Sequence, residues 1–120
     1  MTEKLRVLIV DDQRDAADGL ARVLSAMGHT ALAAYNALDA LVEAKDFGPE
    51  VAIVDISMPG FDGYDLVAEL PKRHPQAVLV ALTGLPPTEV QERGGFDHVL
   101  TKPADAGALG RLLETIAGSR

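Results

Sequence analysis

The sequence predicts a doubly wound α/β fold, in which helices cover both faces of a single parallel sheet. Short apolar runs and segments with helical periodicity alternate along the 120 residues, and this alternation is typical of repeated β-α units. The apolar runs are nearly continuous, as in strands that are buried on both faces. Polar residues follow directly after four of these runs, at the edge where parallel sheets bind ligands. The pattern therefore predicts both the fold and the edge that carries a functional site.

The strands expected from these runs are short and apolar. The first is broken only by Arg6 and is followed by Asp11 and Asp12, while the third is closed by Asp55. Helical crossovers between consecutive strands would make all of them parallel. The expected strands are residues 5–10, 30–35, 51–54, 77–82 and 99–100.

The expected helices carry apolar residues at i, i+3 and i+4 spacing. Asn36 is expected to cap the second helix, because its side chain can accept a backbone N–H. In that helix Leu38, Leu41 and Val42 are expected to face the core. Pro71 is expected to kink or end the third helix. The expected helices are residues 15–27, 37–46, 64–73, 88–93 and 104–117.

The composition limits the classes of function. Acidic residues outnumber basic ones, 18 to 11, and the net charge is −7, so we expect no direct binding to nucleic acid or to an anionic membrane surface. The absence of cysteine excludes disulfides and thiolate metal sites. The sequence has neither a signal-peptide pattern nor an apolar stretch of roughly 20 residues. We therefore expect one cytoplasmic domain that covers residues 1–120.

Three carboxylates are expected to gather at one edge of the sheet. Asp11 and Asp12 follow the first strand, and Asp55 follows the third. Like charges that lie close together repel one another, so this cluster needs a positive partner to stay ionised. A hard divalent cation with oxygen ligands meets this need, and Mg²⁺ binds to carboxylates, water and phosphate oxygens. The three residues are therefore candidate magnesium ligands.

Two more polar residues are expected at the same edge: Thr83 after the fourth strand and Lys102 after the fifth. Taken alone, each residue of this group has a plain structural explanation, such as a turn, a helix cap or a solvated lysine. Together, a carboxylate, a hydroxyl and an ammonium beside a metal suit phosphoryl transfer, which depends on positioning and charge neutralisation. A carboxylate such as Asp55 can act as the nucleophile and form an acyl phosphate.

With these residues in place, the chain resembles the receiver domain of two-component response regulators, of the single-domain or the hybrid-kinase type. The resemblance extends over residues 7–116. The motifs that carry it are VLIVDD at 7–12, DISMPGFDG at 55–63, ALTG at 81–84 and GFDHVLTKP at 95–103. It implies a flavodoxin-like (βα)5 sandwich with a five-stranded parallel sheet in the order 2-1-3-4-5.

The resemblance also implies a role for each site residue. Asp55 resembles the phosphorylated aspartate of the family. Asp12 resembles the direct Mg²⁺ ligand, and Asp11 the residue that holds metal-bound water. Asp55 and the backbone carbonyl of Ser57 would complete the protein's share of the metal shell. Thr83 resembles the switch hydroxyl that binds a phosphoryl oxygen.

Lys102 resembles the cation that pairs with the aspartate and then with the phosphoryl group. The resemblance implies that its peptide bond to Pro103 is cis, an isomer that only about 5–6% of X–Pro bonds adopt.

By the same resemblance, the domain is a signalling switch and not a metabolic enzyme. It would take a phosphoryl group from a phosphohistidine on a histidine kinase or phosphotransfer protein, and lose it slowly to water. A downstream protein would read the face formed by the fourth helix, the fifth strand and the fifth helix. A monomer or weak dimer is expected.

The sequence departs from the family in the part that would carry the signal outward. Val99 occupies a position where the family often has an aromatic residue or histidine, and the neighbouring His98 should point the other way by strand alternation. The segment between Thr83 and Lys102 is roughly one helical turn shorter than usual. We therefore expect a short or poorly ordered fourth helix within residues 86–95.

Smaller expectations concern the surroundings of the site. Ser57 and Leu85 would flank the phosphoryl group, and neither supplies an acid or base for hydrolysis. His29, near the end of an element, is expected to be exposed to solvent.

Two other functions compete with the phosphorylated receiver. One is a receiver fold that binds partners constitutively, which the departures in its output region favour. The other is a flavin carrier or small enzyme of the same fold. Against this stands the absence of a glycine-rich phosphate loop after the first strand, where Asp11 and Asp12 would repel a nucleotide phosphate.

Overall fold

The computed structural model describes residues 4–56, 63–84, 94–103 and 105–119. The sheet has five parallel strands in the order β2-β1-β3-β4-β5. Both the parallel pairing and the strand order confirm the predicted fold. The strands are β1 (Arg6–Val10), β2 (Thr30–Ala34), β3 (Val51–Asp55), β4 (Val78–Thr83) and β5 (His98–Thr101).

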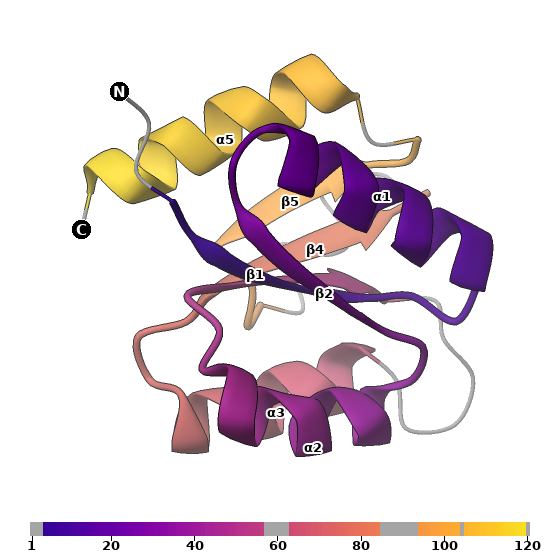
Figure 1. Ribbon diagram of the computed structural model, residues 1–120. Helices are drawn as coiled ribbons and strands as arrows, with labels where there is room; N and C mark the ends of the chain where they lie inside the picture. Colours follow the sequence, from indigo (N-terminus) through magenta and orange to yellow (C-terminus); the bar gives the residue numbers. More distant parts are fainter. Residues whose placement is uncertain (1–3, 57–62, 85–93, 104, 120) are drawn as a thin grey trace.

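Helices cover both faces of this sheet. Figure 1 shows α1 and α5 on one face and α2 and α3 on the other. The predicted helix 88–93 lies outside the described ranges, as does most of residues 86–95, for which a short or poorly ordered fourth helix is expected. The helices within the described ranges are α1 (Arg14–Ala26), α2 (Ala37–Phe47), α3 (Gly63–Arg73) and α5 (Ala106–Gly118).

Two apolar cores lie on the two sides of the sheet, because side chains alternate between its faces along every strand. Strand residues Val7, Ile9 and Ile53 pack with Leu109 and Leu113 of α5 on one side. On the other side the buried residues are Leu8, Val10, Ala52, Val54, Leu66, Leu70, Leu79 and the alanines of α2. β1, β3 and β4 are thus buried on both faces, as their continuous apolar runs predict, whereas the edge strands β2 and β5 are mostly half-buried.

Helix ends follow the expected capping chemistry. The Asn36 side chain accepts the Asp39 backbone N–H at 2.7 Å, which confirms the predicted cap of α2. The Asp105 side chain accepts the Ala108 N–H at 3.1 Å, so α5 begins at Ala106 and not at residue 104. Pro71 lies within α3, which continues to Arg73. Proline lacks the N–H that would donate to the carbonyl four residues earlier, so Pro71 removes one helical hydrogen bond, and α3 ends two residues later and not at Pro71 itself.

The face of α2 that packs on the sheet differs from the prediction. Leu38 and Val42 are 63% and 66% exposed, whereas Ala37, Ala40 and Ala44 are completely buried. Both sets of residues have helical spacing, so periodicity alone could not separate them. The alanine face brings the helix close to the sheet, and the larger side chains face outward. The prediction of an inward Leu38 and Val42 was wrong.

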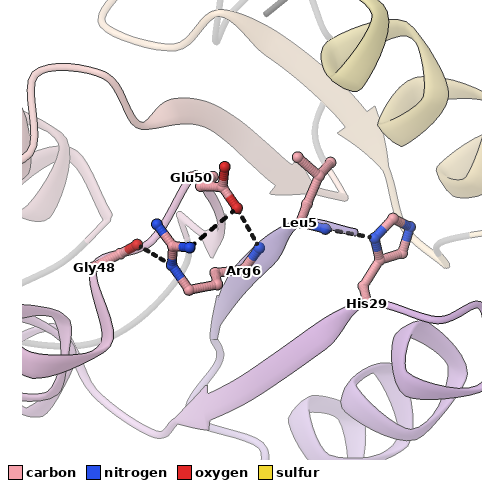
Figure 2. Close-up of polar contacts among 5 residues, drawn as sticks. All are labelled: Leu5, Arg6, His29, Gly48 and Glu50. Atoms are coloured by element: carbon pink, nitrogen blue, oxygen red, sulfur yellow. Dashed lines mark hydrogen bonds and ion pairs between the residues drawn. The ribbon is translucent and has the colours of Figure 1, made fainter. Parts of the chain in front are cut away.

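His29 is buried and not exposed as predicted; only 7% of it is accessible. Its Nδ1 accepts the backbone N–H of Leu5 at 3.1 Å (Figure 2). The imidazole therefore satisfies a buried backbone donor just before β1. Burial lowers the pKa of His29 below its ordinary value of 6.5, because the charged ring is poorly solvated there.

Arg6 ties the start of β1 to the chain before β3. Its Nε donates to the Gly48 carbonyl at 2.8 Å, and its backbone N–H donates to the Glu50 carboxylate at 2.9 Å (Figure 2). The guanidinium also lies 3.7 Å from that carboxylate. These contacts close the amino edge of the sheet, opposite the predicted site.

His29 should make the stability of the protein depend on pH. The pKa of His29 is lowered in the folded state. The contribution of His29 to the free energy of unfolding is therefore complete above about pH 6.5 and declines as the pH falls below that value. His29→Asn keeps an acceptor at the δ position and cannot titrate. We expect it to retain most of the stability at neutral pH and to lose this part of the pH dependence. His29→Ala should cost about 1 kcal/mol at neutral pH. Urea unfolding from pH 5 to 8 measures both; equal slopes for the wild type and His29→Asn would refute the assignment.

Gly95 should tolerate alanine less well than Gly28, although both have a positive φ, +96° and +98°. A Cβ on Gly95 would lie 2.9 Å from Cγ1 of Val67, whereas a Cβ on Gly28 meets nothing within 4 Å. Both substitutions have the backbone cost of a left-handed conformation, and Gly95→Ala adds an overpacking cost of about 1–3 kcal/mol. The difference between the two variants in denaturant unfolding measures this second cost. Equal losses would show that Val67 yields freely.

Candidate functional site

The three predicted carboxylates meet at the carboxyl edge of the sheet. Asp11 follows β1, and Asp55 is the last residue of the adjacent β3. Both are buried, with 3% of each accessible, while Asp12 is exposed. One carboxylate oxygen from each of the three lies within 4.8 Å of the others. The sequence prediction that strand order would bring these residues together is thus confirmed in geometry.

Backbone hydrogen bonds hold Asp11 at this edge. Its N–H donates to the Ala34 carbonyl at 3.1 Å, which extends the pairing of β1 with β2 by one residue. Its side chain accepts the Gln13 N–H at 3.0 Å. Sequence reasoning did not single out Gln13. The signal was available, because an aspartate at the start of a loop often accepts the backbone N–H two residues on.

Lys102 supplies the positive charge of the cluster. Its Nζ lies 3.0 Å from Oδ2 of Asp55 and 3.8 Å from Oδ2 of Asp11. The backbone N–H of Lys102 donates to the Thr83 carbonyl at 2.7 Å, which fixes the residue at the end of β5 beside β4. The Lys102–Pro103 peptide bond is cis, as the resemblance to receiver domains implies.

Thr83 ends β4 at the same edge and is completely buried. In the register of the sheet it pairs with Thr101, while Asp55 pairs with its neighbour Leu82. This register places Thr83 one residue beyond the level of Asp55, between the strands that carry Asp55 and Lys102. Four of the predicted site residues therefore lie on neighbouring strand ends, and Asp12 joins them from the loop.

The charges of the cluster are not balanced by Lys102 alone. The pKa of Asp11 is raised above its ordinary value of 3.8, first because the carboxyl group is buried and also because the charge of Asp55 is close. The Gln13 N–H and the Lys102 ammonium act in the opposite direction without cancelling the effect. Among the described residues, the Lys102 ammonium pairs with two of the three clustered carboxylates, so the site favours a further positive charge.

The donor set fits a magnesium ion. Asp11, Asp12 and Asp55 offer hard carboxylate oxygens that are already close together, and one of the three is exposed, which leaves an open approach for water and phosphate oxygens. The backbone carbonyl of Ser57, which the resemblance adds to this set, lies outside the described residues, as does Leu85.

A groove of about 650 Å³ opens beside the cluster. Asp11 and Lys102 line one end, and Ala16, Leu20 and Val23 of α1 form much of its apolar wall. A reactive group on another molecule could approach the carboxylates along this groove.

The side chains of His98 and Val99, neighbours in β5, point in opposite directions, as strand alternation predicts. Val99 packs against Ile56 and Ala81. His98 lines a hollow with Thr115 and Ile116 of α5 on the other face. His98 therefore cannot take the place of an aromatic residue at Val99.

Comparison with known proteins agrees with this geometry. The chain matches the model of the response regulator receiver domain over residues 7–114. PilH of Pseudomonas aeruginosa is 31% identical, over 92% of this chain and 96% of PilH. The structure of NtrX from Brucella abortus is 31% identical with a TM-score of 0.88, over 98% of this chain and 28% of NtrX. CheY4 of Vibrio cholerae shares the fold, with a TM-score of 0.86 at 24% identity, over 95% of this chain and 99% of CheY4.

The fold and the acidic pocket thus define a signalling domain of two-component systems. The chain belongs to the response regulator receiver domain family. It spans nearly all of PilH and little more than a quarter of NtrX. None of the helices in the described ranges is long and apolar enough to cross a membrane.

Asp11→Asn should stabilise the metal-free protein and weaken its response to Mg²⁺. The change removes a buried charge that repels Asp55 and keeps an acceptor for the Gln13 N–H, so we expect a gain of about 1 kcal/mol in unfolding free energy at neutral pH. Because the pKa of Asp11 is raised in the folded state, this gain should fade as the pH falls through that pKa toward 3.8, where the carboxyl group becomes neutral.

Urea unfolding with EDTA and with saturating Mg²⁺ measures both effects. Asp12→Asn is the matched control, since Asp12 is exposed and its loss should change the metal-free stability little. A destabilised Asp11→Asn protein would contradict the electrostatic account.

Proposed function

We propose that this domain is a phosphorylated switch in which Asp55 accepts a phosphoryl group. The observation that carries the proposal is the buried Asp55 carboxylate, 3.0 Å from the Lys102 ammonium, within a cluster of three acids. A buried nucleophile beside a fixed cation suits phosphoryl transfer, because the cation stabilises charge on the transferred group. Membership of the receiver family supports the same assignment.

In the proposed reaction, an oxygen of Asp55 attacks the phosphorus of a phosphohistidine. The P–O bond to Asp55 forms as the P–N bond breaks, and the donor imidazole takes up a proton as it leaves. Lys102 then pairs with a phosphoryl oxygen, and the Thr83 hydroxyl binds another. Attack of water on the phosphorus would release inorganic phosphate and restore the Asp55 carboxylate.

Mg²⁺ would neutralise the phosphoryl oxygens when it is bound. Asp12 and Asp55 would be direct ligands, Asp11 would hold metal-bound water, and the Ser57 carbonyl would complete the protein's share. The donor chemistry of the described carboxylates supports this set.

The proposed partners are proteins. A histidine kinase or a histidine phosphotransfer protein would donate the phosphoryl group, approaching along the groove beside Lys102. A downstream protein would bind the face formed by the fourth helix, β5 and α5. The domain would cover residues 1–120 and act in the cytoplasm as a monomer or weak dimer. It would serve as a switch with slow self-dephosphorylation and not as a metabolic enzyme.

Phosphorylation is tested with a small-molecule donor. Incubation with labelled acetyl phosphate and Mg²⁺ should add one phosphoryl group to the wild type, and Asp55→Asn or EDTA should abolish the label. Lys102→Met should slow labelling, because the cation that stabilises the transferred group is lost. Intact-mass spectrometry and acid-stable gel labelling measure the product.

The matched control is Asp46→Asn, an exposed residue in the last turn of α2, which should be labelled like the wild type. A wild type that takes no label from acetyl phosphate or from any histidine kinase tested would overturn the proposal. It would favour a receiver that binds its partners constitutively.

A further inference from the structure

A small apolar cluster lies directly next to the carboxylate site, and its member Phe96 also packs against the core on the α2–α3 side of the sheet. Its buried members are Ile56 and Ala81, and Tyr64, Phe96 and Val99 pack against them partly exposed. We call these five residues the aromatic cluster. They come from the chain after β3, from β4, from the first turn of α3, from the approach to β5 and from β5 itself. The cluster therefore joins the elements that surround the site.

The aromatic cluster is linked to the site through adjacent residues. Ile56 follows Asp55 directly, and its N–H lies 3.4 Å from the Leu82 carbonyl, to which it donates. Ala81 precedes Thr83 by two residues, so both side chains lie on the same face of β4. A movement of Asp55 or of Thr83 thus acts first on Ile56 and on the space above Ala81.

The two rings are the parts of the cluster that can respond. Tyr64 and Phe96 pack edge to face, with ring centroids 5.9 Å apart and an interplanar angle of 70°. Ile56 and Ala81 are enclosed, with 6% and 0% accessible, so any change around them must displace a neighbour. The half-buried rings can change rotamer, and because Phe96 also packs against the α2–α3 core, its movement would alter packing at the edge of that core.

The backbone on both sides of Phe96 is held in place. The left-handed Gly95 lies so close to α3 that a Cβ on it would meet Val67 at 2.9 Å. The Asp97 N–H donates to the Leu79 carbonyl of β4 at 2.7 Å, and the Leu79 N–H donates to the Asp97 carboxylate at 2.8 Å. With the backbone fixed, a change in the cluster is directed into the Phe96 side chain and its partner Tyr64.

We propose that the Tyr64–Phe96 pair repacks when Asp55 is phosphorylated, and that it carries the state of the site to the surface between α3 and β5. This inference rests on the proposed function. Binding of a phosphoryl oxygen by Thr83 changes the packing above Ala81, and the new position of Ile56 displaces the rings. Val99 is too small to transmit this change itself, so the change also reaches the surface at the first turn of α3, beside the face formed by the fourth helix, β5 and α5.

Tyrosine fluorescence tests the proposal, because the protein has two tyrosines and no tryptophan. Tyr35→Phe leaves Tyr64 as the single fluorophore; Tyr35 bonds to Asp18 and belongs neither to the site nor to the aromatic cluster. Beryllofluoride with Mg²⁺ serves as the phosphoryl mimic, and ¹⁹F NMR of the bound fluorides reports its binding independently. We expect the intensity of Tyr64 emission to change and to saturate together with the bound ¹⁹F signal.

Phe96→Leu in this background should keep the bound ¹⁹F signal and lose most of the change in Tyr64 emission intensity. Phe47→Leu is the matched control, because Phe47 packs against the α2–α3 core and lies outside the aromatic cluster; it should keep both signals. Phe96→Met, which is closer in volume, replaces Phe96→Leu if that variant does not fold.

The outcomes separate the two proposals. Three outcomes would each overturn the relay and leave phosphorylation standing. They are bound fluoride without a change in Tyr64 emission, a full change in emission in the Phe96 variant, and a loss of the emission change in Phe47→Leu equal to that in the Phe96 variant. Absence of bound fluoride in the Tyr35→Phe protein and in the wild type would overturn the proposed function and the relay with it.

Discussion

The contact of Lys102 with two buried carboxylates is the interaction on which the carboxyl edge of this sheet depends. Asp11 and Asp55 would otherwise face each other with almost no access to solvent, and such a pair cannot remain ionised without a compensating charge. Lys102 reaches them from the end of β5, across β4. The ammonium therefore connects an edge strand to the centre of the sheet. It still leaves an excess of negative charge, which a divalent cation can neutralise.

The opposite edge of the sheet has no such conflict. There Arg6 is paired with Glu50 and with the Gly48 carbonyl, and His29 satisfies the Leu5 N–H (Figure 2). Every one of these contacts is a donor matched to an acceptor, so this edge stabilises the fold. The carboxyl edge instead concentrates like charges, at a cost to stability. Proteins commonly accept such a local cost where chemistry takes place and offset it elsewhere in the structure.

The sequence predicted the strands and the meeting of the three carboxylates well, because both follow from strong local signals. Continuous apolar runs marked β1, β3 and β4, and strand order then brought Asp11 and Asp55 together without any long-range information. The prediction failed where two patterns fitted equally well. In α2, alanines and larger apolar residues had the same periodicity, and only contact with the sheet decides which set is buried. The predicted exposure of His29 was wrong for a related reason, because a nonlocal hydrogen bond from the Leu5 N–H holds its side chain in the interior.

The faces of β4 and β5 on which side chains lie determine which neighbouring residues a change at the site can displace. Ala81, Thr83 and Val99 lie on one face, whereas His98 and Leu100 lie on the other, toward α5. In the proposed switch, a movement of the Thr83 hydroxyl would therefore act on the α3 side first. The side chain at Val99 ends at two methyl groups, so it cannot extend that movement to the outer surface of β5. Tyr64 and Phe96 are larger, reach partial exposure, and contact the same buried residues. The asymmetry of the strand faces, together with the sizes of these side chains, would direct the proposed signal toward the start of α3.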